Sequence, residues 1–161
     1  MTRPSWEQYF KEILFNVSKR STCLRRNVGA IAIQERRIIA TGYNGQMTGT
    51  PHCKVCLRET LKVPSGQRHE ICLAVHAEQN LIAQSAKFGS SIDNSLVLIT
   101  HKPCAICFKL LWNSGVRTIL YYEDYPDDIV DNLIVSTSSK IFHYNNFNLI
   151  TSGNTNIDTI F

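Results

Sequence analysis

Two segments of the sequence decide how this chain folds: Val75-His76-Ala77-Glu78-Gln79-Asn80 and Pro103-Cys104-Ala105-Ile106-Cys107. His76, Cys104 and Cys107 supply one imidazole and two thiolates, a ligand set for a catalytic zinc whose fourth position stays open to water. The carboxylate of Glu78 follows closely and is suited to act as a general acid and base. The two segments therefore predict a metal-assisted hydrolytic centre.

Both segments fall at predicted helix starts. A helical pattern runs over 78–87, and Pro103 begins a second helix through residue 113. Helix N-termini present backbone N–H groups and the positive end of the dipole, and both favour deprotonated thiolates. Cys104 and Cys107 are three positions apart, so they share one face of a helical turn and can hold the same metal.

The remaining pattern predicts an α/β fold. The expected elements are a helix ending near residue 19 after the capping box Ser5-Trp6-Glu7-Gln8, strands at 28–33 and 38–41 joined by a turn at 34–37, the helix 78–87, a strand at 96–100, the helix 103–113, a strand at 118–122, and a further helix and strand, the strand at 141–144. This order predicts a three-layer sandwich, with helices on both faces of a mixed central sheet.

Composition narrows the class of protein. The chain has 161 residues, of which 43% are hydrophobic, enough for a single domain, which we place at 1–144 with a loosely tied, Asn-rich tail at 145–161. No apolar run reaches the roughly 18 residues of a membrane span, and the start lacks a secretory signal, so we expect a cytoplasmic protein. The net charge of +4 is too mild and too dispersed for nucleic acid and suits a small anionic molecule.

The loop from Gly45 to Val75 is long and has no helical or strand periodicity, so it needs a cross-link such as a bound metal to hold it in place. Four further cysteines could hold it in place, namely Cys23, Cys53, Cys56 and Cys72. His69 is a fifth candidate ligand. A second, structural zinc bound by these cysteines would supply the cross-link, with His69 replacing Cys56 or Cys72 as an alternative. The competing interpretation is that all four are ordinary thiols.

A His-x-Glu followed by Pro-Cys-x-x-Cys is the signature of zinc-dependent nucleobase deaminases. The longer matching stretches are Ser21-Thr22-Cys23-Leu24-Arg25-Arg26-Asn27-Val28-Gly29-Ala30, Thr41-Gly42-Tyr43-Asn44-Gly45, Val63-Pro64-Ser65-Gly66-Gln67-Arg68-His69-Glu70-Ile71-Cys72, Thr100-His101-Lys102-Pro103 and Tyr121-Tyr122-Glu123-Asp124-Tyr125-Pro126. Together with the two metal segments they resemble the deoxycytidylate (dCMP) deaminases over roughly residues 4–126.

The resemblance implies the cytidine-deaminase-like fold and the hydrolysis of dCMP to dUMP and ammonia, which supplies dUMP for thymidylate synthesis. It implies a catalytic zinc, with Glu78 moving protons between water, the ring nitrogen and the leaving ammonia. It also implies a homo-oligomer, with a hexamer favoured, that dCTP activates and dTTP inhibits.

The resemblance and the neighbouring cations indicate ligand contacts. We expect the sugar of the nucleotide near Asn44, the phosphate near Arg26 and Lys102, and the base beside Ala77. The remaining candidates are Tyr122 and Tyr125, which flank the base or belong to the aromatic core, and Gly42, Tyr43 and Gly45, which shape the substrate or the effector site.

The sequence departs from the family's final helix and strand from Asp127 onward. This departure bears on assembly and regulation more than on chemistry. Three other functions share the zinc signature: deamination of another cytosine nucleotide such as dCTP, deamination of adenosine in tRNA, and a non-enzymatic effector-sensing subunit. The absence of a basic face argues against the tRNA enzyme, and the intact Glu78 argues against the sensor.

Overall fold

The protein is represented by a computed structural model, which describes residues 2–137 and 140–143. Its helices and strands are α1 Trp6–Ser18, β1 Gly29–Gln34, β2 Arg37–Tyr43, β3 Gly45–Gln46, α2 Leu57–Thr60, a 3₁₀ turn at His69–Ile71, β4 Ala74–Val75, α3 Ala77–Phe88, β5 Leu96–His101, α4 Ala105–Asn113, β6 Thr118–Glu123, α5 Asp128–Thr137 and β7 Lys140–His143. The predicted tail at 145–161 lies outside the described residues. Within the described part, no helix is long and apolar enough to cross a bilayer.

The central sheet is mixed, as the sequence predicts. Its strand order is β2-β1-β5-β6-β7. Strand β1 is antiparallel to β2 and to β5, whereas β5, β6 and β7 run parallel. The parallel half follows from the crossover helices α4 and α5, because a parallel connection requires a crossover.

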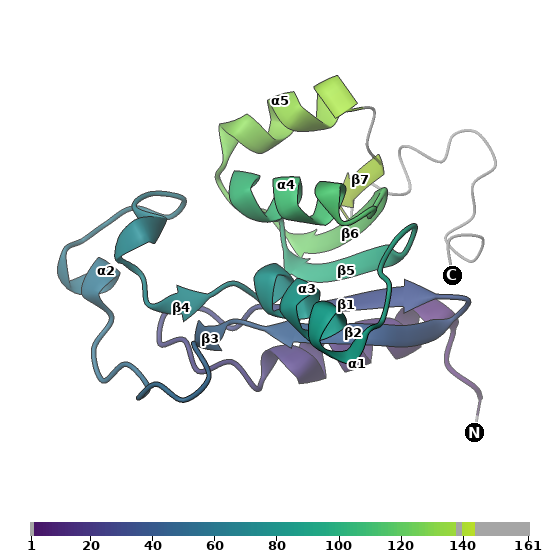
Figure 1. Cartoon of the computed structure of the whole chain (residues 1–161), viewed down its shortest axis with the longest axis horizontal. Coiled ribbons are helices and arrows are strands. Elements are labelled where there is room, and N and C mark those ends of the chain that lie inside the picture. The colour runs from purple at the N-terminus through teal and green to yellow at the C-terminus, as the bar shows by residue number, and fades with distance from the viewer. Residues whose placement is uncertain (1, 138–139, 144–161) are drawn as a thin grey trace.

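Helices cover both faces of this sheet (Figure 1). Alternate residues of β1 face opposite ways: Ala30 and Ala32 belong to the core under α3 and α4, while Ile31 and Ile33 pack with Phe10 and the rest of the α1 core. The small alanines let α3 approach the sheet closely, and the larger isoleucines fill the space against α1. The structure thereby confirms the predicted three-layer α/β sandwich.

One part of the chain, the loop 45–75, differs from the prediction, whereas the predicted final helix and strand are both present. The loop 45–75 contains a short ribbon, in which β3 pairs antiparallel with β4, as well as the short helix α2. Figure 1 shows the α2 part of this loop projecting from one end of the sandwich. After Asp127, where the sequence departs from the family pattern, the chain still forms α5 and β7, and β7 pairs with β6. Apolar periodicity in this segment is sufficient to complete the layer despite the unfamiliar sequence.

Candidate active site

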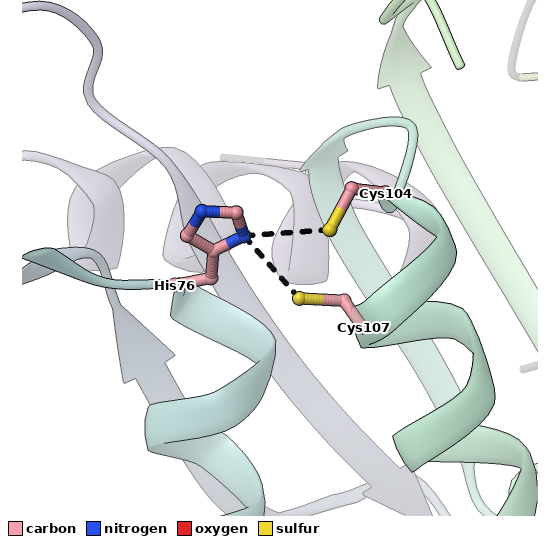
Figure 2. A group of neighbouring side chains, drawn as sticks. All are labelled: His76, Cys104 and Cys107. Carbon is pink, nitrogen blue, oxygen red and sulfur yellow. Dashed lines mark hydrogen bonds between the residues drawn. The ribbon is translucent and has the colours of Figure 1, made fainter. Parts of the chain in front are cut away.

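Three side chains converge at the starts of α3 and α4. His76 is the N-cap residue of α3 and Cys104 is the N-cap residue of α4, with Cys107 one turn further along. Figure 2 shows the ring of His76 directed at both sulfur atoms. The Nδ1 atom of His76 lies 3.6 Å from Sγ of Cys104 and 3.4 Å from Sγ of Cys107. The donor atoms of all three lie within 4.8 Å of one another.

This spacing fits a tetrahedral zinc. Bonds of about 2.0 Å to nitrogen and about 2.3 Å to sulfur, at a tetrahedral angle, separate the two donor atoms by about 3.5 Å. The observed separations of 3.4 and 3.6 Å agree with that value. Three protein ligands leave the fourth corner of the tetrahedron open, as in catalytic zinc sites.

The two cysteines differ in their affinity for a proton. A hydrogen bond from Cys107 stabilises the Cys104 thiolate and lowers the pKa of Cys104 to about 4. The same hydrogen bond, together with burial, raises the pKa of Cys107. The pair therefore shares one proton, which a metal must displace to bind both sulfurs as thiolates.

The start of α4 is capped by a residue far along the chain. The backbone N–H of Ala105 donates to Oδ2 of Asp127 at 2.8 Å, and the N–H of Ile129 donates to Oδ1 of the same carboxylate at 3.2 Å. One side chain thus satisfies the exposed donors of two helices. Asp127 thereby fixes the helix start that carries Cys104.

Glu78 lies on the first turn of α3 and is only 4% exposed. Burial raises the pKa of its carboxyl, which favours the protonated form at higher pH than in water. It is not one of the three clustered metal ligands. The close approach of β2 helps to place it, since a side chain at Gly42 would collide with the backbone of Ala77 and Leu81. A buried carboxyl with a shifted pKa next to a metal site is typical of an acid–base catalyst.

A cavity of about 80 Å³ opens beside these residues. Its lining comes from five separate parts of the sequence, two of which carry metal ligands: Arg26, Val28, Asn44, His76, Ala77, Glu78, His101, Lys102, Cys104 and Tyr125. The structure therefore brings together five of the six predicted substrate residues, and Tyr122 is the exception. Val28 and His101 were not predicted. His101 directly precedes Lys102 at the end of β5, so a strand-end position was the one signal that pointed to it.

The basic residues of this cavity have different partners. Lys102 donates to Asp131 at 2.6 Å, and Nε2 of His101 lies 3.1 Å from Glu123. Arg26 instead donates to the hydroxyl of Ser65 at 2.8 Å and lies over the ring of Tyr125. Within residues 2–137 and 140–143, no carboxylate forms an ion pair with Arg26. Of the two predicted phosphate contacts, Arg26 is therefore the one whose charge is not neutralised by a neighbour.

Asn44 holds the wall of the cavity. Its Oδ1 accepts the N–H of Val28 at 2.8 Å, and its Nδ2 donates to the carbonyl of Arg26 at 2.9 Å. One amide hydrogen and one lone pair remain available for a ligand. The side chain is only 7% exposed, so its position is fixed before any ligand binds.

The two predicted tyrosines lie on opposite sides of the sheet. Tyr125 lines the cavity, whereas Tyr122 packs with Phe15 and Lys11 on the α1 side. Residues two apart on a strand share a face, and Leu120 already belongs to the α1 core, so Tyr122 follows it there. Tyr122 therefore does not flank the base, and it belongs to the aromatic core, which was the alternative interpretation.

The predicted effector residues line a separate cavity. Gly42, Tyr43 and Gly45 contribute to a space of about 430 Å³ between the end of β2 and the outer face of α3. Polar side chains such as Asn80 and Gln84 from α3 also line it. These three residues therefore line a cavity other than the one that contains Glu78.

The four further cysteines line one small cavity of about 150 Å³. They are Cys23, Cys53, Cys56 and Cys72. His69, the alternative ligand, points elsewhere: its Nε2 lies 3.0 Å from the hydroxyl of Tyr125. Its ring also meets that of His76 edge-on, with the centroids 5.2 Å apart. The geometry therefore separates His69 from the four cysteines and places it at the rim of the first metal site.

The sequence and structure are similar to those of known deaminases. A family model described as cytidine and deoxycytidylate deaminase zinc-binding region matches residues 4–123. ComE operon protein 2 of Bacillus subtilis is 39% identical over 127 residues, covering 78% of this chain and 63% of that protein. The deoxycytidylate deaminase of Mycobacterium phage D29 is 33% identical, covering 75% of this chain and 97% of that protein. The chain spans less than two thirds of the Bacillus relative.

A solved structure shares the whole architecture. The dCMP deaminase of cyanophage S-TIM5, crystallised with dCMP and dUMP, superposes with a TM-score of 0.70 and is 27% identical. The similarity covers 89% of this chain and 99% of that protein. The helix starts that carry the metal ligands fall inside the stretch that the family model matches.

Proposed function

This chain belongs to the cytidine and deoxycytidylate deaminase family, and from that premise we propose that it hydrolyses dCMP to dUMP and ammonia and so supplies dUMP for thymidylate synthesis. The observation that carries the proposal is the cavity in which the buried Glu78, the three metal ligands and the unneutralised Arg26 meet. The phage enzyme bound to dCMP and dUMP supports the same substrate. We also propose a cytoplasmic location, because none of the six cysteines is paired in a disulfide and metal-binding cysteines stay reduced there.

In the proposed reaction, the protein's own residues position the base and move protons. When bound by His76, Cys104 and Cys107, zinc supplies Lewis acidity that makes water nucleophilic near neutral pH. Glu78 takes one proton from the attacking water and gives it to the ring nitrogen. It then takes the second proton from the hydroxyl formed on the ring carbon and gives it to the amino group, which leaves as ammonia. Its raised pKa suits this task, because a group that must both accept and donate works best with a pKa near the working pH.

Arg26 supplies the proposed preference for a nucleotide over a nucleoside. A hydrogen bond to a charged group contributes about 1.5–3 kcal/mol, so losing one phosphate contact lowers kcat/KM roughly tenfold or more. We therefore expect Arg26→Ala to lower kcat/KM for dCMP by at least about tenfold and to leave any activity on deoxycytidine nearly unchanged. Ammonia release measured with dCMP, CMP, dCTP and deoxycytidine gives this comparison.

The neighbouring arginine is the matched control. The guanidinium of Arg25 donates to the carbonyl of Val63 and does not line the cavity. Arg25→Ala should therefore affect dCMP and deoxycytidine alike. Wild-type protein that is equally active on dCMP and deoxycytidine would contradict the assignment of a nucleotide substrate. Greater activity on dCTP than on dCMP would identify the substrate as a triphosphate.

Regulation by dCTP and dTTP is the second part of the proposal, and the cavity bounded by Gly42, Tyr43 and Gly45 supports it. Its volume of about 430 Å³ is within the range of small-molecule sites. Asn80 of α3 lines this cavity and donates to the carbonyl of Tyr43 at 2.8 Å, and its backbone N–H donates to the carbonyl of His76. We also propose a homo-oligomer, with a hexamer favoured. The same ammonia assay with added dCTP or dTTP tests the regulation.

We also propose a second, structural zinc at the cysteine-lined cavity. Among the described residues only the donor atoms of His76, Cys104 and Cys107 already lie within 4.8 Å of one another, so the four cysteines would draw together around this ion. Four cysteines from three separate parts of the sequence surround the cavity, and the segment they enclose has little apolar core of its own. Nε2 of Gln46 lies 2.9 Å from Sγ of Cys53, a contact suited to a thiolate. We assign Cys23, Cys53, Cys56 and Cys72 as its ligands, because His69 is directed toward Tyr125.

Elemental analysis should find two zinc ions per chain. Cys53→Ser should release one of them and lower the thermal stability of the loop, while the zinc held by His76 stays in place. Limited proteolysis between residues 45 and 75 should speed up before kcat falls, because the loop depends on this metal as a cross-link. A fully active, well-folded wild-type protein with a single zinc would show that the four cysteines are ordinary thiols.

A further inference from the structure

The segment between Cys56 and Cys72 touches the catalytic cavity through its tip. The hydroxyl of Ser65 accepts a hydrogen bond from Arg26 at 2.8 Å, and the backbone N–H of Gly66 donates to the hydroxyl of Tyr125 at 2.8 Å. Gly66 has a φ of +81° and lies so close to Pro126 that a side chain at this position would meet the carbonyl of Pro126. The tip is therefore fitted closely against the residues that follow β6.

His69 completes these contacts. Its Nε2 lies 3.0 Å from the same hydroxyl of Tyr125 that accepts the Gly66 N–H. Because that oxygen already accepts one hydrogen bond, its own proton is available for Nε2, and His69 then serves as the neutral acceptor. The hydroxyl of Tyr125 is thus held from two sides.

The fixed ring of Tyr125 in turn supports Arg26. The guanidinium carbon lies 5.1 Å from the ring centroid, and the rings of His69 and Tyr125 are stacked with an interplanar angle of 28°. A cation over an aromatic face is attracted by the ring quadrupole. A rotation of Tyr125 would therefore remove both a wall of the cavity and the surface on which Arg26 rests.

We propose that His69 is a positioning residue for nucleotide binding, which acts through Tyr125 to hold Arg26 in place for the phosphate of the substrate. This inference rests on the proposed dCMP deaminase activity and deepens it. It gives His69 a role in substrate affinity in place of a role as a zinc ligand. The contacts of His69 to Tyr125 and His76, away from the four-cysteine cavity, carry the assignment.

The test separates substrate affinity from chemistry. His69→Ala should raise KM for dCMP about fivefold, the effect of one lost hydrogen bond, while kcat changes less than about twofold. The KM for deoxycytidine, which has no phosphate, should change much less. His69→Gln should restore most of the affinity, because its amide oxygen can accept from Tyr125. Metal content should stay at the wild-type value in both variants.

A double-mutant cycle checks that the effect passes through Tyr125. Tyr125→Phe keeps the ring and removes the hydroxyl, so it should raise KM for dCMP about as much as His69→Ala. The double variant should be little worse than either single variant, since both remove the same hydrogen bond. Glu70→Gln is the matched control, because Glu70 lies on the same 3₁₀ turn but is exposed and pairs with Arg68. It should leave KM unchanged.

Titration with dCMP by calorimetry distinguishes failure of the proposed function from failure of the inference about His69. Wild-type protein that neither binds nor deaminates dCMP would overturn the proposed function, and this inference with it. Wild-type protein that binds dCMP with the same affinity as His69→Ala would overturn the inference alone. Loss of zinc in His69→Ala would also overturn it and would return His69 to the metal ligands.

Discussion

Glu78→Gln should lower kcat by at least about a hundredfold and leave the zinc content unchanged. General acid–base catalysis contributes about a hundredfold to ten-thousandfold to a rate, and glutamine cannot transfer the proton. The metal stays because Glu78 is outside the cluster of His76, Cys104 and Cys107. Steady-state ammonia release together with elemental analysis of the same preparation measures both properties.

The folding of this variant can be checked independently. Glu78 is almost fully buried, and burial raises the pKa of its carboxyl. A neutral amide of similar shape removes the cost of burying a charge, so thermal unfolding should not begin at a lower temperature. Near-normal turnover in Glu78→Gln would refute the assignment of Glu78 as the proton shuttle.

Cys104→Ala should abolish activity by a different route, through loss of the catalytic metal. Removing one of three protein ligands leaves an imidazole and a single thiolate, which cannot retain zinc in competition with water and chelators. We expect turnover to fall at least as far as in Glu78→Gln, by about a hundredfold or more, with one zinc lost per chain.

The zinc held by the other four cysteines provides the internal reference for this measurement. Cys104→Ala should lose the catalytic zinc and keep the structural one. Cys53→Ser should lose the structural zinc and keep the catalytic one. Loss of both ions from Cys104→Ala would indicate general unfolding, and thermal unfolding measured alongside would show it. Full activity in Cys104→Ala would contradict the ligand set itself.

The sequence predicts the parts of this molecule that depend on neighbours in the chain. The sequence predicts helices that begin at Glu78 and Pro103, and the structure begins α3 at Ala77 and α4 at Ala105, with His76 and Cys104 as the N-cap residues. The layers follow from alternation, as in β1. Tyr122 was predictable in principle, because it shares a strand face with Leu120, but the sequence does not state which helix covers that face.

Contacts between distant segments are beyond such patterns. The pairing of Arg26 with Ser65, and of His69 with Tyr125, depends on how the loop 57–71 folds back on the sheet. Nothing periodic in that loop indicates its direction. From the sequence alone, His69 is as good a candidate zinc ligand as the neighbouring cysteines. Only its position in the structure, beside Tyr125, indicates another role. The same limit applies to Lys102, which follows β5, because its partner Asp131 lies on α5.

The bond from Asp127 to the start of α4 connects the metal site to the order in which the chain is made. All three ligands leave the ribosome before Asp127, because synthesis and folding proceed from the N-terminus. Until Asp127 emerges, the N–H of Ala105 beside Cys104 has water as its partner. A segment synthesised after all three ligands thus completes the helix start that carries the cysteines, and a nascent chain ending before Asp127 should hold its thiolates less firmly than a chain that includes it.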